Sequence, residues 1–366
     1  MSLRALVTTD TVGGVWTFAM ELGTTLSRAG FEIELATMGG PVSASQRAQA
    51  EAIPRLRIHE SHYRLEWMEE SWISVVEAGE WLLDLERRHG PDLIHLNGYV
   101  HAALPWRAPV IVTAHSCVLS WCRAVHGGDA PPAWDHYADE VRRGLQSAKI
   151  VVAPTRAMLD AIVAHYGEPA DGRVIPNGRS PWGFTRASKR RKILTAGRVW
   201  DEAKNIAALD RVAPGLSWPV VVAGPRKHPD GGTVRLRGAK TLGVLGPDEL
   251  TRAYASAAIF ALPALYEPFG YSPLEAALSG CALVLGDIPS LREVWGDAAC
   301  FVPPRDDQAL LQTLRWLIAE PRVRKEYAKR ALARAADYTP ERMTIGYMEA
   351  YRDALDDPLE LFGARA

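Results

Sequence analysis

Along the first part of the chain, short apolar runs alternate with a stretch in which apolar residues recur at helical spacing. Residues 3–9 form a short apolar run, residues 15–30 place apolar side chains at helical spacing and end at Gly30, and residues 31–37 form a second apolar run. A strand, loop, helix and strand in this order predict a β-loop-α-β unit with parallel strands. Similar runs recur at 91–98, 108–116 and 148–155. The first half therefore predicts a doubly wound α/β domain.

Residues 176–192 interrupt this pattern, because they are rich in Gly, Pro, Ser and basic residues, as linkers are. Apolar runs return at 192–198, 218–225, 258–264 and 281–287, with helices expected from about residue 205 and over 272–280. We predict two Rossmann-like doubly wound domains, residues 1–182 and 183–340, that face each other across a cleft. A C-terminal helical segment, residues 341–366, could pack back on the N-terminal domain.

The composition is that of a globular protein. The chain has 366 residues, too many for one ordinary core, with 48% hydrophobic and 23% charged residues. A formal net charge of −1 leaves no overall electrostatic footprint for nucleic acid, so we expect no such partner. The basic run at residues 189–192 is a local exception, which we interpret as a solvated linker.

Several features bear on where the protein works. Its four cysteines are sparse and irregularly spaced, which indicates a reducing compartment. The first residues do not resemble a signal peptide, and no apolar run approaches the roughly 18–20 residues that span a bilayer. We expect a cytoplasmic protein, and peripheral contact with the inner face of the membrane stays open.

The loop after the first strand contains Gly13 and Gly14 directly before a helix. Paired glycines allow a ligand to approach the backbone, and a helix N-terminus favours an anion. The loop is not a Gly-x-Gly-x-x-Gly fingerprint, and the second strand ends in Ala36 and Thr37 rather than an acid. A nicotinamide or flavin cofactor is therefore not expected. A purely structural turn is an equal alternative.

The loop at residues 196–205 contains Arg198 and Lys204 directly after a strand of the second domain. A planar guanidinium and a flexible ammonium together suit a diphosphate. The alternative is that these cations pair with Asp201 and Glu202 at the surface.

Residues 266–280 contain two glutamates, Glu267 and Glu275. Ser272 and Glu275, with Pro273 between them, have the spacing of a capping box, which would explain Glu275 without a ligand. The backbone amides of Phe269, Gly270 and Tyr271 are expected to point out of the helix start, giving a second anion site. Glu267 lies in the preceding loop, beside that site.

The ordered motifs of the second half resemble a known family. Residues 197–205 (GRVWDEAKN) and 242–304, which include YEPFGYSPLEAALSG, are similar to the second domain of retaining GT-B glycosyltransferases. The resemblance is to the large group with bacterial mannosyl- and glucosyltransferases and sucrose synthase-like enzymes, and it spans nearly all of residues 193–304. The first half resembles the group more loosely, through residues 13–37 and the short motifs TAHS, APT and IPNG.

This resemblance implies a role for individual residues. Arg198 and Lys204 would hold the donor diphosphate, and Glu267 would lie by the donor sugar. Glu275 would bind the ribose hydroxyls. Backbone amides of Phe269, Gly270 and Tyr271 would contact sugar hydroxyls or phosphate, and backbone groups of Leu242 and Gly243 would contact the nucleobase. Gly13 and Gly14 would face the phosphates. His115 would lie near the reacting sugar.

Two departures from the family pattern and one alternative for His115 remain. Ala264 stands where the family has serine, and the IPNG motif continues with Arg179 and Ser180 rather than a hydrophobic residue and Asp. The second departure leaves the hinge region in doubt. His115 could instead be a core histidine. A zinc site formed with nearby cysteines and His126 is disfavoured, because the spacing does not match a zinc knuckle.

The expected reaction is transfer of a sugar from a nucleotide diphosphate-sugar to an acceptor hydroxyl, with retention implied by the resemblance. The acceptor would be a sugar, a lipid-linked molecule or a small molecule. No cofactor and no obligatory metal are expected, since no Asp-x-Asp motif lies in a suitable loop. The alternatives are a nucleotide-sugar epimerase or a phosphorylase of the same fold, and a non-catalytic nucleotide-sugar-binding protein.

Overall fold

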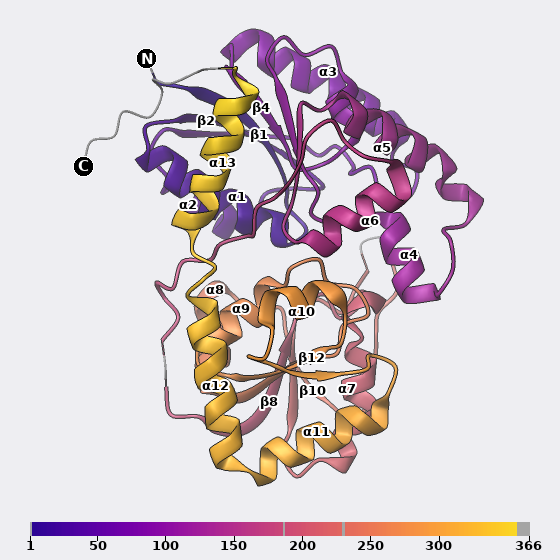
Figure 1. Cartoon of the computed structure of the whole chain (residues 1–366), viewed down its shortest axis with the longest axis vertical. Helices are drawn as coiled ribbons and strands as arrows, with labels where there is room; N and C mark the ends of the chain where they lie inside the picture. Colours follow the sequence, from indigo (N-terminus) through magenta and orange to yellow (C-terminus); the bar gives the residue numbers. More distant parts are fainter. Residues whose placement is uncertain (1, 186, 229–230, 357–366) are drawn as a thin grey trace. The chain divides into compact units, whose positions relative to one another are not determined.

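The computed structural model of the chain describes residues 2–185, 187–228 and 231–356. It divides into two compact units (Figure 1). The first contains residues 1–120, 129–178 and those from Pro340 onward, and the second contains residues 121–128 and 179–339. Among the described residues, no helix has both the length and the apolar composition needed to cross a membrane.

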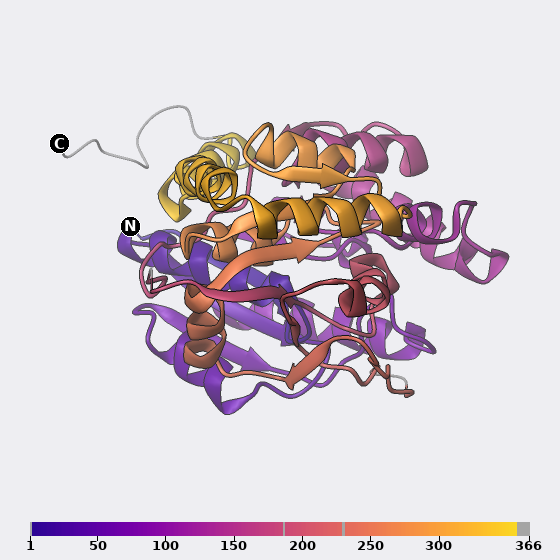
Figure 2. The same cartoon turned by 90° about the horizontal axis from the view of Figure 1, so that it is seen from below.

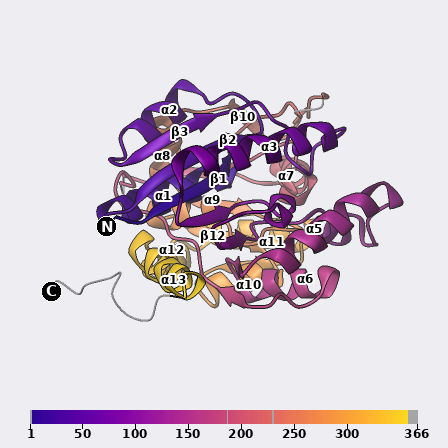
Figure 3. The ribbon, with the colours of Figure 1, turned by 90° about the horizontal axis from the view of Figure 1, so that it is seen from above.

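The first unit is built on a seven-stranded sheet whose paired strands are all parallel, in the order β3-β2-β1-β4-β5-β6-β7. Strands β1, β2 and β3 run side by side in Figure 3. The strands are β1 (Arg4–Asp10), β2 (Glu32–Met38), β3 (Leu56–Glu60), β4 (Leu93–Leu96), β5 (Val110–Thr113), β6 (Ile150–Ala153) and β7 (Gly172–Val174). The central strands β4, β5 and β6 are buried along their whole length, as expected for a parallel sheet covered on both faces.

Helices connect these strands. They are α1 (Gly14–Arg28), α2 (Ala44–Glu51), α3 (Trp72–His89), α4 (Val118–His126), α5 (Asp135–Ser147), α6 (Arg156–Tyr166), and the short η1 (Val100–Ala103) and η2 (Pro132–Trp134). Side chains cap two of these helices. Ser43 and Gln46 form a reciprocal capping box at α2, and the Thr155 hydroxyl accepts the Met158 N–H at α6.

The C-terminal helix α13 (Pro340–Ala354) belongs to this first unit, where it packs against α1. Thr344 of α13 is hydrogen-bonded to Thr25 of α1. Buried tyrosines anchor the helix more deeply: Tyr351 lies 2.6 Å from His95 of β4, and Tyr347 lies 3.0 Å from Thr113 of β5, measured between the bonded atoms. The helix therefore completes the polar network in the core of the first sheet.

The second unit contains a six-stranded sheet of parallel pairs in the order β10-β9-β8-β11-β12-β13. Its strands are β8 (Arg190–Ala196), β9 (Val220–Ala223), β10 (Lys240–Gly243), β11 (Ala257–Leu262), β12 (Ala282–Gly286) and β13 (Cys300–Val302). Side chains of adjacent residues on a strand point to opposite faces of a sheet, and Ile193 and Leu194 accordingly belong to two separate buried clusters.

The helices of this unit are α7 (Ile206–Val212), α8 (Pro247–Ser256), α9 (Tyr271–Leu278), α10 (Pro289–Trp295), α11 (Asp307–Ala319) and α12 (Pro321–Ala335), with the short η3 (Glu202–Lys204) and η4 (Ala213–Gly215). Helix α12 packs against β12 and α9 and is seen nearly end-on in Figure 2. The interpretation of residues 189–192 as a linker is wrong, because β8 already begins at Arg190. Lys189 donates to the backbone oxygen of Ser279 at 2.7 Å, which fixes the start of the strand.

His95 provides a pH-dependent test of the first core. Burial, with a smaller effect of nearby His115, lowers the pKa of His95 to about 3. An unfolded histidine takes up its proton near pH 6.5, so the unfolded state binds more protons between about pH 6.5 and 3. Folding stability contributed by neutral His95 is therefore lost as the pH falls through this window. We expect His95→Gln to reduce the slope of unfolding free energy against pH by up to ~1.4 kcal/mol per unit.

Urea denaturation at a series of pH values between about 4 and 6 measures this slope. His62→Gln is the matched control, because His62 is exposed and its replacement should leave the slope unchanged. Equal slopes for the wild type and His95→Gln would contradict the prediction.

Candidate functional site

The strand order of each sheet reverses at one place, and ligands of open α/β sheets bind outside the carboxyl ends of the strands at such a point. The reversal lies between β1 and β4 in the first sheet and between β8 and β11 in the second. Gly13 and Gly14 follow β1, Arg198 and Lys204 follow β8, and Glu267 follows β11. The predicted residues therefore lie on the loops where the topology favours a ligand.

Backbone hydrogen bonds join the two loops at the switch point of the second sheet. The backbone oxygen of Ala203 accepts the N–H of Leu265 at 2.8 Å. The Asn205 side chain donates to the backbone oxygen of Pro263 at 2.9 Å. Asn205 has φ 51°, a left-handed conformation that asparagine adopts more readily than most residues. These contacts hold the loop after β8 against the loop after β11.

Lys204 and Glu267 form an ion pair between these loops. Lys204 Nζ lies 2.7 Å from Glu267 Oε2, and the side chains are 16% and 12% exposed. The Ser290 hydroxyl donates to the backbone oxygen of Glu267 at 2.6 Å, which fixes the loop from the side of α10. The alternative in which Lys204 is neutralised by nearby Glu202 is wrong, because its partner is the distant Glu267.

Arg198, by contrast, does pair with Asp201, at 2.8 Å from Nη2 to Oδ2. Burial would raise the pKa of Asp201, but the charges of Lys204 and Arg198 hold that pKa below its ordinary value. Asp201 also accepts a hydrogen bond from Trp121 at 3.1 Å. Arg198 Nε is buried without a hydrogen-bond partner among the described residues. Because an unsatisfied buried donor is costly, this N–H is poised for an acceptor that a ligand could supply.

Helix α9 begins earlier than its sequence suggests. Its N-cap is Gly270, with φ 97°, and no side chain caps the helix. The predicted capping box of Ser272 and Glu275, with Pro273 at the first helical position, is therefore wrong. Glycine adopts the left-handed conformation without the strain that a Cβ would bring, so the chain turns into the helix two residues sooner. The amides of Gly270 and Tyr271 lie at the resulting helix start, while the Phe269 side chain is buried.

Glu275 pairs with Arg179 rather than with the helix start. Arg179 Nε donates to Glu275 Oε1 at 2.9 Å, and the Glu275 side chain is 12% exposed. The guanidinium also lies over the Phe184 ring, 5.0 Å from its centroid. The Arg179 N–H donates to the backbone oxygen of Tyr338 at 2.9 Å, where the two passages of the chain between the units lie together.

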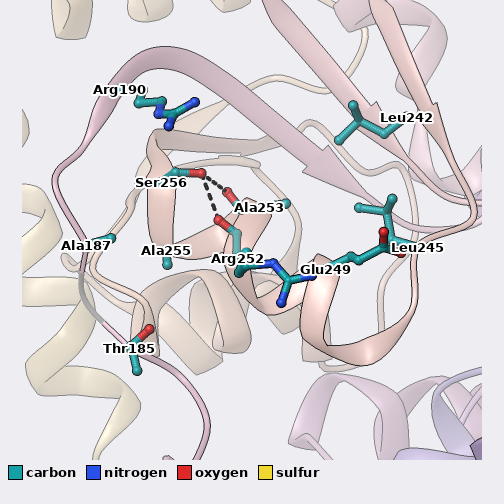
Figure 4. Close-up of a pocket in the computed structure, with 10 residues that line it drawn as sticks. All are labelled: Thr185, Ala187, Arg190, Leu242, Leu245, Glu249, Arg252, Ala253, Ala255 and Ser256. Atoms are coloured by element: carbon teal, nitrogen blue, oxygen red, sulfur yellow. Dashed lines mark hydrogen bonds between the residues drawn. The ribbon is translucent and has the colours of Figure 1, made fainter.

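Leu242 and Gly243 end the edge strand β10. Leu242 is 43% exposed, and Gly243 has φ 73°. The Gly243 oxygen accepts the N–H of Gly224 at 2.8 Å. Leu242 also lines a pocket of about 510 Å³ beside α8, which Figure 4 shows with its other lining residues, Thr185, Ala187, Arg190, Leu245, Glu249, Arg252, Ala253, Ala255 and Ser256. The Ser256 hydroxyl in this pocket is already bonded to the backbone of α8.

The remaining predicted residues belong to the first unit. Asp10 at the end of β1 accepts the N–H groups of Val12 and Gly13, both at 2.9 Å. This turn presents Gly13 as the N-cap of α1 and Gly14 as its first residue. His115 follows β5, and its Nε2 lies 2.7 Å from Asn97 Oδ1. Burial lowers the pKa of His115 to about 3.

Potential metal ligands come together elsewhere in the first unit. Within the described ranges, Glu34, His59 and His89 bring their potential ligand atoms close enough together to hold a metal ion. This group does not include His115, the nearby cysteines or His126. Arg4 and Arg57 lie 4.0 and 3.7 Å from the Glu34 carboxylate. Two guanidinium groups so close to the carboxylate compensate its charge, so the cluster is better suited to an ion-pair network than to a cation.

Sequence reasoning missed four residues of these sites: Arg179, Asp201 in its bridging role, Ser290 and Asn97. Arg179 was visible as a departure from the family pattern, but its partner Glu275 is 96 positions away. Asn97 follows β4 at the carboxyl edge of the sheet, and this position is the feature of the sequence that could have indicated it as a site residue.

Two glycosyltransferase family profiles match the chain. The profile of "Glycosyltransferase Family 4" matches residues 12–181, and that of "Glycosyl transferases group 1" matches residues 190–320. Among curated relatives, the chain is 25% identical over 293 residues to O-antigen chain mannosyltransferase B of Escherichia coli, covering 72% of this chain and 73% of the relative. It is 26% identical over 407 residues to a D-inositol 3-phosphate glycosyltransferase of Kineococcus radiotolerans, covering 95% and 92%.

The chain is a family 4 glycosyltransferase. Its fold is the GT-B fold, with two parallel Rossmann-like sheets. The crystal structure of Anabaena HepE in complex with UDP-glucose is similar to it with a TM-score of 0.76 at 15% identity, covering 96% of this chain and all of that one. The protein transfers a sugar from a nucleotide diphosphate-sugar to an acceptor in glycan or glycoside biosynthesis. This assignment disfavours the epimerase, phosphorylase and non-catalytic alternatives.

The Arg179–Glu275 pair predicts a measurable contribution to stability. Removing one partner of a largely buried ion pair leaves the other charge uncompensated. We expect Arg179→Met to lower the unfolding free energy of the glycosyltransferase by about 1–3 kcal/mol, since the arginine side chain is 27% exposed and solvent screens part of the loss. Chemical denaturation measures the change.

A double-mutant cycle with Glu275→Gln isolates the pair, because the second substitution should cost less once Arg179 is gone. The matched control is Arg292→Met, which breaks the exposed Arg292–Asp287 pair and should cost under ~1 kcal/mol. Strictly additive losses would show that Arg179 and Glu275 do not stabilise each other.

Proposed function

We propose that the loops at the switch point of the second sheet form the donor site of a retaining hexosyltransferase. The observation that carries this proposal is the Lys204–Glu267 ion pair between those loops. In this assignment Lys204 and Arg198 bind the diphosphate. Glu267 lies by the sugar, and Glu275 binds the ribose hydroxyls. Arg198 Nε–H has no hydrogen-bond partner among the described residues, which supports a phosphate contact, because guanidinium groups bind phosphate through directed N–H donors.

The other predicted contacts are assigned by the same reasoning. Backbone groups of Leu242 and Gly243 lie at the nucleobase, and the amides from Phe269 to Tyr271 contact sugar hydroxyls or phosphate. Gly13 and Gly14 face the phosphates, since their loop ends in the N-terminus of α1. His115 lies near the reacting sugar. The acceptor is a sugar, a lipid-linked molecule or a small molecule.

The chemistry of this site is mainly electrostatic. The bond between the anomeric carbon and the diphosphate oxygen breaks, with the bonding electrons leaving on the diphosphate. The acceptor hydroxyl oxygen bonds to that carbon on the same face, and its proton passes to the departing diphosphate. Negative charge grows on the departing diphosphate, where Arg198, Lys204 and the helix-start amides stabilise it. The roles of Lys204 and Glu267 differ, because the lysine acts on the leaving group and the glutamate on the sugar.

Lys204→Met tests the diphosphate contact. We expect it to weaken binding of the nucleotide diphosphate-sugar by about 10- to 100-fold, the usual loss for one hydrogen bond to a charged group. Isothermal titration calorimetry measures the affinity. Lys325→Met is the control, because Lys325 is an exposed residue of α12 and its loss should leave binding unchanged. Equal affinities for the wild type and Lys204→Met would remove the diphosphate assignment.

Glu267→Gln tests the sugar contact and should have a different signature. Removing the negative charge beside Lys204 does not weaken the attraction for the diphosphate, so donor affinity should be retained. We expect kcat to fall by about 10²-fold, as for loss of one transition-state contact. Single-turnover rates with a competent acceptor measure this loss, and NMR of the product reports the anomeric configuration. Full transfer activity in Glu267→Gln, or an inverted product, would refute this part of the proposal.

A thermal-shift screen identifies the donor. UDP-, GDP-, ADP- and dTDP-sugars are compared at equal concentration, since a ligand at 100 times its Kd stabilises the folded state by ~2.7 kcal/mol. We expect one nucleotide class to raise the melting temperature of the wild type and to raise that of Lys204→Met less. A screen without any shift at millimolar donor would count against a donor site in this chain.

A further inference from the structure

Asn97 and His115 meet at the carboxyl edge of the first sheet. Asn97 follows β4 and His115 follows β5, and these strands are paired with Leu96 opposite Val112. Asn97 Oδ1 lies 2.7 Å from Nε2 of the histidine. The other side of the imidazole region is apolar, since the Phe18 ring of α1 meets it edge to face with centroids 4.6 Å apart.

Two further hydrogen bonds fix the orientation of the Asn97 side chain. Its Nδ2 donates to the backbone oxygen of Thr8 at 2.6 Å, and its backbone N–H donates to the Thr8 hydroxyl at 2.9 Å. A flipped amide would place Oδ1 against the Thr8 oxygen, and two acceptors cannot share a hydrogen bond. Oδ1 therefore faces His115. Because a carbonyl oxygen only accepts, the proton of the neutral imidazole must be on Nε2.

The surroundings also keep His115 uncharged. Burial lowers its pKa to about 3, and burial likewise lowers the pKa of neighbouring His95 to about 3. Glu66, the carboxylate beside the loop after β4, accepts the N–H groups of Tyr99 and Val100 at 3.1 Å each. Asn97 thus offers the ring a neutral acceptor, whereas a carboxylate at the same place would favour the imidazolium.

We propose that Asn97 is a positioning residue for sugar transfer, which holds His115 as the neutral Nε2–H tautomer. The proposal rests on the proposed function, in which His115 lies near the reacting sugar. Positive charge develops at the anomeric carbon of a sugar as its leaving group departs. A neutral imidazole adds no electrostatic repulsion at the anomeric carbon. Because its tautomer is fixed, the ring has the same orientation in every molecule.

NMR of the ¹⁵N-labelled wild-type enzyme tests the tautomer without any activity measurement. We expect the His115 signals of a proton-bearing Nε2 and a bare Nδ1 throughout about pH 5.5 to 8, because the ring does not titrate there. Small shifts from Glu66, whose burial raises its pKa to about 7, do not change this tautomer assignment. His95 serves as an internal reference, since hydroxyl groups of Tyr351 and Thr113 bond both of its nitrogens. A proton on Nδ1 of His115, or an imidazolium signal in this range, would overturn the proposal.

Two variants test the consequence for transfer. Asn97→Ala should give a mixture of His115 tautomers and lower kcat by about tenfold or more, with donor Kd unchanged. Asn97→Asp should raise the pKa of His115, so its kcat should decline as the pH is lowered, while that of the wild type shows no such limb. A single Nε2–H tautomer together with wild-type kcat in Asn97→Ala would refute the positioning role.

Tyr99→Phe is the matched control for damage to the same loop. It removes the hydrogen bond from the Tyr99 hydroxyl to the backbone oxygen of Ser116, at 2.6 Å, and leaves Asn97 in place. We expect its His115 tautomer and kcat to match the wild type, and equal losses in both variants would contradict the proposal. Failure of the proposed function gives a different result: the wild-type protein shows the expected His115 tautomer but binds no donor. The wild-type spectrum needs no variant, so the test stands even where a substitution prevents folding.

Discussion

The ion pair between Lys204 and Glu267 is the interaction on which the proposed donor site depends. The two residues are 63 positions apart and reach each other because β8 and β11 are neighbours at the switch point of the second sheet. Ala203, Asn205 and Ser290 hold the loop backbones so that the pair can form. Lys204 and Glu267 thus neutralise each other. In the proposed donor site, the diphosphate would replace the carboxylate as the partner of Lys204, which would link donor binding to the arrangement of both loops.

Arg179 forms a second ion pair between distant positions of the second unit. Its side chain neutralises Glu275, and its backbone bonds Tyr338 where the chain passes between the units. Arg179 stands where the sequence departs from the pattern that the resemblance implies, and its charge offsets that of the largely buried Glu275 carboxylate.

The network between the first sheet and α13 consists of neutral polar groups, whereas ion pairs join the loops at the switch point of the second sheet. His95, Thr113, Tyr347 and Tyr351 form a buried hydrogen-bonded network between the sheet and α13. Burial of ionised groups is costly, whereas neutral donors and acceptors that are mutually satisfied are tolerated in a core. His115 and Asn97 continue this neutral chemistry to the carboxyl edge of the sheet. The proposed tautomer control is a consequence of the same constraint.

Sequence alone determined the two doubly wound sheets, because the order of short apolar runs and helical segments is a local pattern. It also indicated Arg198 and Lys204 as candidates, because their loop follows a strand, and Glu267, from its place in the loop before a helix and from the family resemblance. It failed at residues 189–192 and at the start of α9, where basic residues inside a strand and the left-handed Gly270 override the local signals. Only the tertiary structure decided the pairs Lys204–Glu267, Arg179–Glu275 and Asn97–His115. Each pair joins different strands or loops, and which of them become neighbours depends on the strand order of the sheets rather than on any spacing along the chain.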